Sequence, residues 1–255
     1  MTIEQILAEE FNLKEEQVVK TVELIDEGNT IPFIARYRKE VTGSLDDTIL
    51  RDLFDRLTYL RGIAKRREEV KNLIDAQGKL TEELVAAIDA AQTITEIDDI
   101  YRPYRPHRKT RASVARERGL EPLADLIFEQ REEYEKSLEE IAAEYIDEEK
   151  GVATIEDALA GANDIIAEMI SDDADIRKML RLKMDKLAVI SVQATDPDKD
   201  SVYRNYYDFS SPVSRLQNHQ VLAINRGEKE EFLKPSVDIS KDIPLNYLTY
   251  HVVSN

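Results

Sequence analysis

The sequence contains no cysteine, and it has only 8 glycines and 8 prolines among 255 residues. The absence of cysteine excludes disulfides, thiolate metal sites and cysteine nucleophiles. The three histidines, His107, His219 and His251, are isolated from one another along the chain. Their spacing matches no metal-ligand motif, so we expect ordinary surface or structural roles for them.

Long apolar runs are missing as well. No stretch approaches the roughly 18 to 20 apolar residues that a bilayer-spanning helix needs. The chain begins Met1-Thr2-Ile3-Glu4-Gln5, which opens an acidic amphipathic segment instead of a basic leader with an apolar stretch. We therefore expect no membrane association, and a cytoplasmic location fits a chain without cysteine.

The residues that are abundant favour helices. Charged residues make up 34% of the chain and apolar residues 42%, with many Glu, Lys, Ala and Leu. These residue types have high helix propensity, and the scarcity of glycine and proline removes helix breakers. We predict a mainly α fold, large enough for one large domain or two small ones, with little sheet.

Apolar spacing predicts a helical pair at the start of the chain. The first helix contains Ile3, Ile6 and Leu7 and ends near Asn12, and the second runs over residues 15–27 until Gly28. The pair has the outline of a helix-turn-helix. Its second helix carries five acidic residues against Lys14 and Lys20, which suits a phosphate-lined groove poorly, so we interpret the pair as structural.

A long helix is predicted from about Asp46 to Gln77. Ser44 and Asp47 have the spacing of a capping box at its start. Its inward stripe is predicted to consist of Ile49, Leu53, Leu57, Leu60, Ala64, Val70 and Ile74. Shorter helices are predicted at about 81–88, 111–118, 122–130, 137–146, 154–170 and 176–187, and residues 94–101 are predicted to form a further short helix or a turn.

The residue types change after Val189. Residues 189–192 and 202–209 are rich in β-branched and aromatic residues, which predicts a few short strands near the carboxy end, with helix as the alternative for part of them. Residues 232–239 are a candidate for a further strand. Ser210-Ser211-Pro212 predicts a turn. Residues 219–226 predict a short helix that Gly227 stops.

Charge is distributed unevenly along the chain. The whole chain has 35 basic and 52 acidic residues, a net charge of −17. Residues 101–118 have seven basic residues against Glu117 alone, whereas residues 129–176 have seventeen acidic residues against three basic ones. We expect these two segments to pair. Pro103 and Pro106 disfavour helix, so residues 101–106 are predicted to form an extended, exposed strap.

The candidate site residues are basic and aromatic: Arg36, Arg38, Arg102, Tyr104, Arg105, Arg108, Lys109 and Arg111. Two roles fit them. Arginine and tyrosine can contact the phosphates and stack on the bases of a single strand. The same arginines can instead bridge carboxylates of neighbouring helices as an internal clamp. No residue is singled out for catalysis, cofactor binding or metal binding, since the sequence has no Gly-rich phosphate loop and no G-x-S-x-G elbow. We expect no enzymatic activity.

Three segments carry a family resemblance: IPFIARYRKEVTGSLDD at 31–47, YRPYRPHRKTRASVARERGLEPLADLI at 101–127 and HQVLAINRGEKEEFLK at 219–234. Together they resemble the amino-terminal region of the bacterial Tex transcription accessory family. The resemblance implies that RNase-H-like, helix-hairpin-helix and S1 RNA-binding domains follow this region in a longer polypeptide. We therefore expect the chain to be an expressed piece of such a protein.

The resemblance implies three parts: a helical pair at 1–45, a helical scaffold with the basic strap at 46–188, and a mixed segment at 189–255 that leads toward the further domains. The expected function is a scaffold that supports RNA binding by those domains, without cofactors. The alternative is a protein-interaction module that docks to the transcription machinery through acidic helices. An enzyme would depend on the RNase-H-like domain. The net charge of −17 predicts weak nucleic-acid binding by this region alone.

Overall fold

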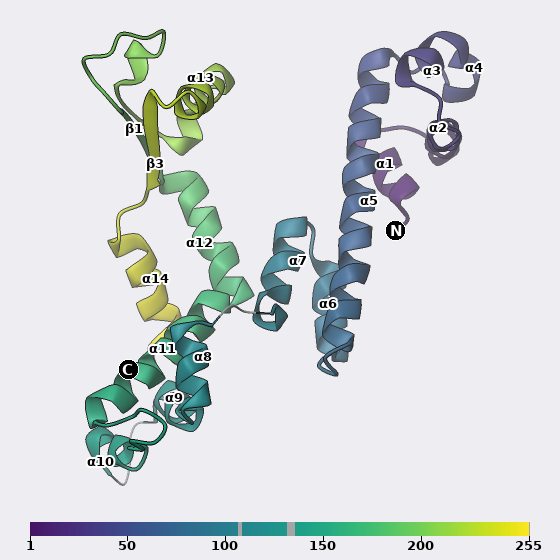
Figure 1. Cartoon of the computed structure of the whole chain (residues 1–255). Coiled ribbons are helices and arrows are strands. Elements are labelled where there is room, and N and C mark those ends of the chain that lie inside the picture. The colour runs from purple at the N-terminus through teal and green to yellow at the C-terminus, as the bar shows by residue number, and fades with distance from the viewer. Residues whose placement is uncertain (107–108, 132–135, 255) are drawn as a thin grey trace. The chain divides into compact units, whose positions relative to one another are not determined.

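The computed structural model describes residues 1–106, 109–131 and 136–254. It divides into two compact units, Met1–Tyr104 and Arg105–Asn255. Helices dominate both units, and a three-stranded sheet lies in the second (Figure 1). The predicted mainly α fold with a few strands near the carboxy end is therefore confirmed. The family-based divisions at residues 45 and 188 stay predictions.

The first unit begins with the predicted helical pair. Helix α1 spans Ile3–Glu10, where Thr2 closes a capping box with Gln5, and α2 spans Glu15–Asp26. Asn12 has a φ of 52° in the connection, and Gly28 has a φ of 84° just after α2. Both residues therefore end a helix in the left-handed conformation, as their sequence positions indicate.

Two short helices, α3 (Ile31–Tyr37) and α4 (Lys39–Thr42), precede the long helix α5 (Asp47–Asp75). The long helix is confirmed, but the predicted cap is wrong. Asp46 is the N-cap, and its carboxylate accepts a hydrogen bond from the Ile49 amide at 2.9 Å. Ser44 has a φ of 64°, whereas an N-cap residue needs extended backbone, so Ser44 belongs to the preceding turn.

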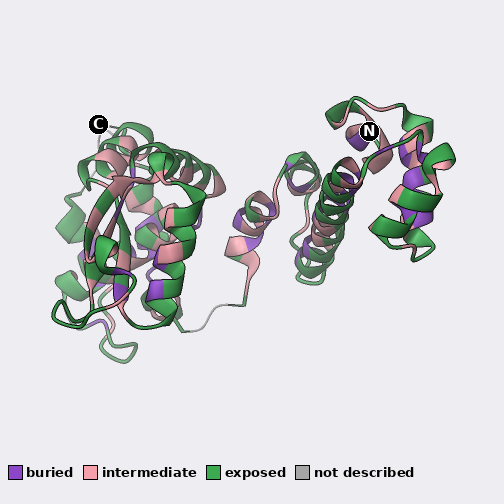
Figure 2. Ribbon diagram, turned by 90° about the horizontal axis from the view of Figure 1, so that it is seen from above, coloured by how far each residue is buried: buried purple, intermediate pink, exposed green. Residues whose placement is uncertain are grey.

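One face of α5 forms the centre of the first unit (Figure 2). Its buried residues are Leu50, Leu53, Leu57, Leu60, Ile63, Val70 and Ile74. Of the predicted stripe, Ile49 is half-buried and Ala64 is exposed, while Leu50 and Ile63 take the inward positions. Helices α1 and α2 contribute Leu7, Val18 and Val22 to the same core.

Helices α6 (Glu82–Ala90) and α7 (Ile94–Tyr101) also pack on α5, and the 3-10 turn η1 (Arg102–Tyr104) follows α7. The predicted extended strap is wrong here. Pro103 sits in the middle of η1, and Tyr101 and Tyr104 pack against the core. A proline at this point of a turn costs no hydrogen bond, and burial of two tyrosine rings favours the compact path.

The second unit opens with a helical cluster: α8 (Arg111–Glu117), α9 (Glu121–Phe128), α10 (Leu138–Ala143) and α11 (Ile155–Asp172). Gly119 ends α8 with a φ of 85°, and Thr154 and Asp157 form the predicted capping box of α11. Leu120, Leu123, Ala158, Ala162 and Ile165 lie at the centre of this cluster.

Helix α12 (Ala174–Leu187) leads from this cluster to the sheet. Strand β1 (Val189–Ala194) is central and pairs antiparallel with β2 (Asp208–Pro212) and β3 (Leu233–Asp238). The turns η2 (Arg204–Tyr206) and η3 (Val213–Arg215) and helices α13 (Asn218–Lys229) and α14 (Asp242–Val252) complete the unit.

Three predictions in this part are wrong. Ser210-Ser211-Pro212 belongs to β2, because Ser210 pairs with Ser191 and β2 is an edge strand, where proline is tolerated. Much of 202–209 forms η2 and its flanking turn. Gly227 is buried inside α13 rather than ending it, since Leu233 and Tyr203 pack directly against it.

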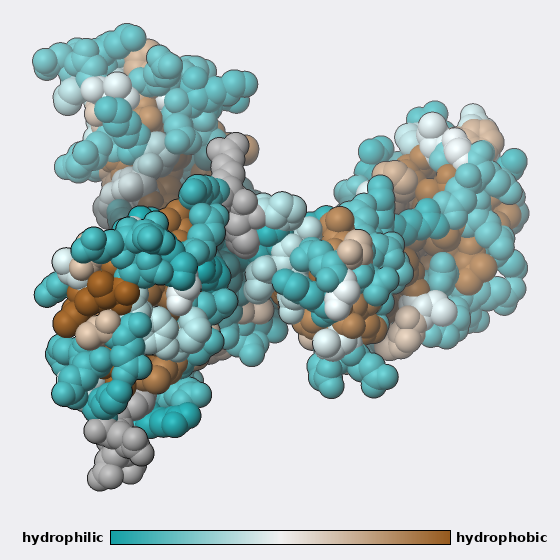
Figure 3. Space-filling model, turned by 60° about the horizontal axis from the view of Figure 1, so that its bottom comes forward, coloured by the Kyte–Doolittle hydropathy of each residue, from teal (hydrophilic) through white to brown (hydrophobic). Residues whose placement is uncertain are grey.

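On the face that Figure 3 shows, each unit is mainly hydrophilic, and scattered hydrophobic residues also reach the surface. In the described part of the chain, no helix is both long enough and apolar enough to cross a bilayer.

Candidate nucleic-acid interface

The basic segment and the acidic segment meet where α8 packs along α11. The Arg116 guanidinium of α8 contacts the Glu168 carboxylate of α11, and its Nε lies 3.1 Å from the Glu121 carboxylate of α9. The Thr110 hydroxyl donates a 2.9 Å hydrogen bond to Glu168. The expected pairing of the two segments is therefore confirmed at this contact.

Arg116 is the most enclosed cation of this contact. Burial disfavours its charge, but the bonds to Glu168 and Glu121 outweigh burial and raise its pKa above the ordinary arginine value. The Glu168 side chain is only 19% exposed. A carboxylate in that position needs its cationic partner, so the arginine contributes to the packing of three helices.

The other basic residues at the start of α8 are more exposed. Arg111 lies 3.4 Å from Asp164 with 87% of its side chain exposed, and Lys109 lies 3.4 Å from Glu117. Both also line a pocket of about 410 Å³ between α8 and α11, whose wall includes Asp157 and Asp164. The pocket therefore presents charges of both signs, which weakens its attraction for a polyanion.

The candidate residues nearest the prolines have mixed positions. Arg102 and Tyr104 are half-exposed at the end of the first unit, and Gln77 donates a 2.9 Å hydrogen bond to the Tyr104 carbonyl. Arg105 is half-exposed in the second unit, and Arg108 lies outside the described residues. The candidates thus belong to separate places in two units, and the choice between clamp and nucleic-acid contact stays a prediction for them.

A different arrangement surrounds Arg36 and Arg38. We define the α3 patch as Phe33, Arg36, Tyr37, Arg38 and Lys39. The Phe33 and Tyr37 rings have centroids 5.3 Å apart, and the Arg38 guanidinium lies 5.2 Å from the Phe33 ring centroid. Arg38 also donates a 3.1 Å hydrogen bond to the Tyr37 carbonyl.

The α3 patch is cationic and lacks neutralising carboxylates. Within the described ranges, neither Arg36 nor Lys39 forms an ion pair, and both are exposed. Phe33 and Tyr37 were not among the residues that the sequence singled out. The signal that would have found them is the acid-free run of residues 28–39, which has three basic residues and two rings.

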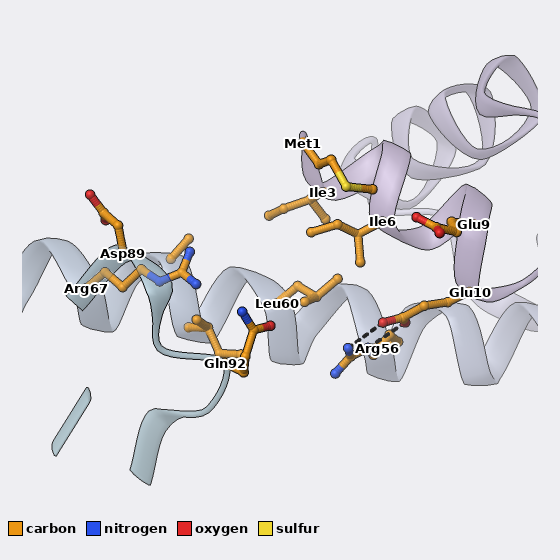
Figure 4. Close-up of a pocket in the computed structure, with 12 residues that line it drawn as sticks. Met1, Ile3, Ile6, Glu9, Glu10, Arg56, Leu60, Arg67, Asp89 and Gln92 are labelled. Carbon is orange, nitrogen blue, oxygen red and sulfur yellow. Dashed lines mark hydrogen bonds and ion pairs between the residues drawn. The ribbon is translucent and has the colours of Figure 1, made fainter. Parts of the chain in front are cut away.

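The first unit also has a pocket of about 650 Å³ between α1, α5 and the end of α6 (Figure 4). Ile3, Ile6 and Leu60 form its apolar part. The Arg56–Glu10 ion pair closes one end, and Arg67 lies at the other. Arg67 donates a 2.8 Å hydrogen bond to the Ala91 carbonyl, while its Nε is buried without a hydrogen-bond partner in the described part of the structure.

Metal chemistry has no support in the geometry. Over the described residues, no three histidine, cysteine, aspartate or glutamate side chains gather in a way that could hold a metal ion. His219 lies in α13 and His251 in α14, and His107 lies outside the described residues.

Two family models match the sequence. Residues 1–75 match a model described as the Tex-like protein N-terminal domain, and residues 133–251 match one described as Tex central region-like. The first match includes the α3 patch, and the second includes α11, the sheet and α13.

Curated relatives match almost the whole chain. YdcI of Bacillus subtilis (strain 168) is 41% identical over 256 residues, which is 99% of this chain and 35% of the relative. The transcriptional accessory protein Tex of Neisseria gonorrhoeae is 39% identical over 95% of this chain and 32% of its own length. The human S1 RNA-binding domain-containing protein 1 is 34% identical over 94% of this chain and 24% of its length. The chain thus spans about a third or less of these relatives.

Proposed function

Because the chain belongs to the Tex family, of which it carries the N-terminal and central regions, we propose that it is a helical scaffold for a longer RNA-binding protein. The relatives' names support a role near transcription and RNA. One is named a transcriptional accessory protein, and another is named for an S1 RNA-binding domain. In this proposal the RNA is bound mainly by parts of the protein outside these 255 residues.

The α8–α11 contact is the observation that carries the scaffold role. The basic side chain with the shortest contacts there is that of Arg116. It faces two carboxylates of the same unit, those of Glu168 and Glu121. A phosphate would have to displace those carboxylates. The net charge of −17 opposes the long-range approach of a polyanion further.

A salt-titrated binding comparison tests this proposal. Binding of a single-stranded RNA is measured for this chain and for a full-length relative such as YdcI between about 0.05 and 0.3 M salt. We expect the relative to bind well at about 0.15 M salt and this chain to bind weakly or not at all. Equal affinity of the two proteins at that salt concentration would contradict the scaffold role.

We further propose that this region has no hydrolytic or transferase activity of its own, since no nucleophile or phosphate loop is evident in its sequence. The test is a nuclease assay on highly purified chain with added divalent cations. Turnover that persists through purification and disappears when one carboxylate of this chain is replaced would show that the region is catalytic.

A protein-interaction module is the second candidate function. Its specific support is an acidic surface in the second unit, where Glu148, Glu149 and Glu156 are exposed and form no ion pair within the described residues. Such a surface suits a basic protein partner of the transcription machinery. Capture of purified RNA polymerase by this chain, lost in a Glu148→Lys/Glu149→Lys variant, would favour this function over the scaffold.

A further inference from the structure

We propose that the α3 patch binds unpaired nucleotides of single-stranded RNA. This inference goes beyond the scaffold role, because it gives the amino-terminal unit a direct contact with the strand. It depends on the exposure, the charge and the rigid base of the patch.

Both rings of the patch are accessible to solvent. Phe33 is 36% exposed and Tyr37 is 61% exposed, although burial of either ring in the unit's core would be favourable. They are four residues apart on α3, so they share one face of the helix, and their planes are inclined by 46°. The rings therefore present aromatic surface on which a base can stack.

The charges beside these rings are available to a phosphate. Four arginines of α5 are matched with carboxylates: Arg51 with Asp47, Arg56 with Glu10, Arg61 with Asp26 and Arg66 with Asp98. In contrast, Arg36 and Lys39 have no such match among the described residues, and Glu40 is the sole acidic residue from Gly28 to Leu45. The patch is therefore a local cationic surface, whose basic side chains form no ion pair within the described residues.

The base of the patch is held firmly. Ile34, which points away from the rings toward the core, is fully buried with Leu24, Leu45 and Leu50. Pro32 fixes the backbone in the first turn of the helix, where a proline costs no hydrogen bond. The rings and cations therefore project from a fixed helix, and little ordering is needed when a ligand binds.

These features favour an unpaired strand over the other polyanions. Stacking of a base on an aromatic side chain is worth about 1–3 kcal/mol and needs a free base face, which a duplex hides. An acidic peptide would satisfy the cations but would offer no flat π-face to Phe33 and Tyr37. The combination of exposed rings with unmatched guanidinium and ammonium groups fits nucleotides best.

Fluorescence anisotropy with a labelled oligouridine at about 0.05 M salt tests the proposal on the 255-residue chain. We expect measurable binding that Tyr37→Ala weakens about 5- to 10-fold. Arg36→Ala/Lys39→Ala should weaken binding and reduce the dependence of log K on log salt by about 1.4, since two phosphate contacts with a single strand are lost.

Tyr59→Ala is the matched control. Tyr59 is 38% exposed and lies 5.3 Å from a guanidinium, that of Arg56, but this arginine is paired with Glu10. We expect the Tyr59→Ala variant to bind the oligouridine with the same affinity as the parent chain. Melting temperatures of all variants should be close to that of the parent, because the replaced side chains are exposed.

Three results would overturn the proposal: no binding at about 0.05 M salt, equal affinities of Tyr37→Ala and Tyr59→Ala, or binding of labelled polyglutamate with the same sensitivity to Tyr37→Ala. The last result would identify the patch as a site for an acidic protein. The scaffold role is tested by a different experiment, the comparison with a full-length relative. Either proposal can therefore fail while the other still stands.

Discussion

Arg116 joins three helices at one point, because a single guanidinium of α8 reaches Glu121 of α9 and Glu168 of α11. Replacement by alanine removes the guanidinium partner of a carboxylate that is only 19% exposed, while the Thr110 hydroxyl still donates to Glu168. We expect Arg116→Ala to lower the free energy of unfolding by about 1–2 kcal/mol, measured by urea denaturation.

The control for this prediction is Arg111→Ala. The Arg111–Asp164 pair belongs to the same helix contact but is largely solvent-exposed, so its loss should cost about 0–0.5 kcal/mol. If the two variants are equally stable, the Arg116 contacts do not hold the helices together.

Two ion pairs of the first unit should make its stability depend on pH. The Arg56 hydrogen bond lowers the pKa of Glu10, and the Arg61 hydrogen bond lowers the pKa of Asp26. A carboxyl group whose pKa is lower in the folded state stabilises the fold above its ordinary value, which is 4.5 for Glu10 and 3.8 for Asp26. This stabilisation is lost as the pH falls through the lowered pKa.

Stability should therefore fall between about pH 5 and pH 3, and Arg56→Gln/Arg61→Gln should make that fall smaller. Solvent screening keeps each pair's contribution below about 1 kcal/mol, since all four side chains are more than a third exposed. Urea denaturation of both proteins at several pH values checks this. Parallel stability curves for the two proteins would rule out a role for these pairs in acid sensitivity.

At the scale of whole elements, replacing a helical glycine by alanine should have opposite effects on stability at Gly227 and at Gly62. At Gly227 in α13, an added Cβ would lie 2.5 Å from Leu233 Cδ1, 2.8 Å from its Cγ and 3.2 Å from the Tyr203 ring. The close approach of α13 to β3 thus requires glycine. We expect Gly227→Ala to destabilise the protein by about 1–3 kcal/mol despite the better helix propensity of alanine, as measured by thermal unfolding.

Gly62 in α5 provides the contrast. A Cβ there would meet only Ile94 Cδ1 at 3.8 Å, which is ordinary van der Waals contact. Gly62→Ala should therefore stabilise the protein by about 0.5–1 kcal/mol.

A stabilising Gly227→Ala variant would show that α13 can move away from the sheet at little cost.

Gly227 also shows why some elements could be predicted from the sequence and others could not. Periodicity located α5 and α7 to within about two residues, because apolar spacing follows from helix geometry alone. Gly227 and Ser210–Pro212 were misassigned, since both depend on partners distant in sequence: Leu233 for the glycine and Ser191 for the strand. Ser44 was misassigned because its left-handed backbone serves the preceding turn.

The candidate site was only partly predictable for a related reason. Local charge counts correctly indicated that the basic and acidic segments would meet, but they could not say that Arg116 would be the arginine enclosed there. The exposure of Phe33 and Tyr37 depends on which face of α3 carries Ile34 into the core, and a short helix gives too little periodicity to decide this.

At the scale of the whole molecule, the hydrophobic cores are contained within the units. Among the residues that the structure describes, Leu7, Leu57 and Ile97 belong to a core drawn from the first unit, and Leu123 and Ile165 to one drawn from the second. We expect residues 1–104 expressed alone to be helical by circular dichroism and to unfold cooperatively. A non-cooperative thermal transition of this piece would mean that its core needs the rest of the chain.

Helix α5 also gives the first unit a mechanical property. Its 29 residues make a rod about 43 Å long at the usual rise per residue. Ile34 of α3 packs with Leu50 near the amino end, and Gln77, just beyond the carboxy end, holds the Tyr104 carbonyl. A tilt of about 10° at one end of such a lever displaces the other by about 7 Å. A small rotation of the helix about its carboxy end would thus become a large displacement of the surface that carries Phe33 and Tyr37.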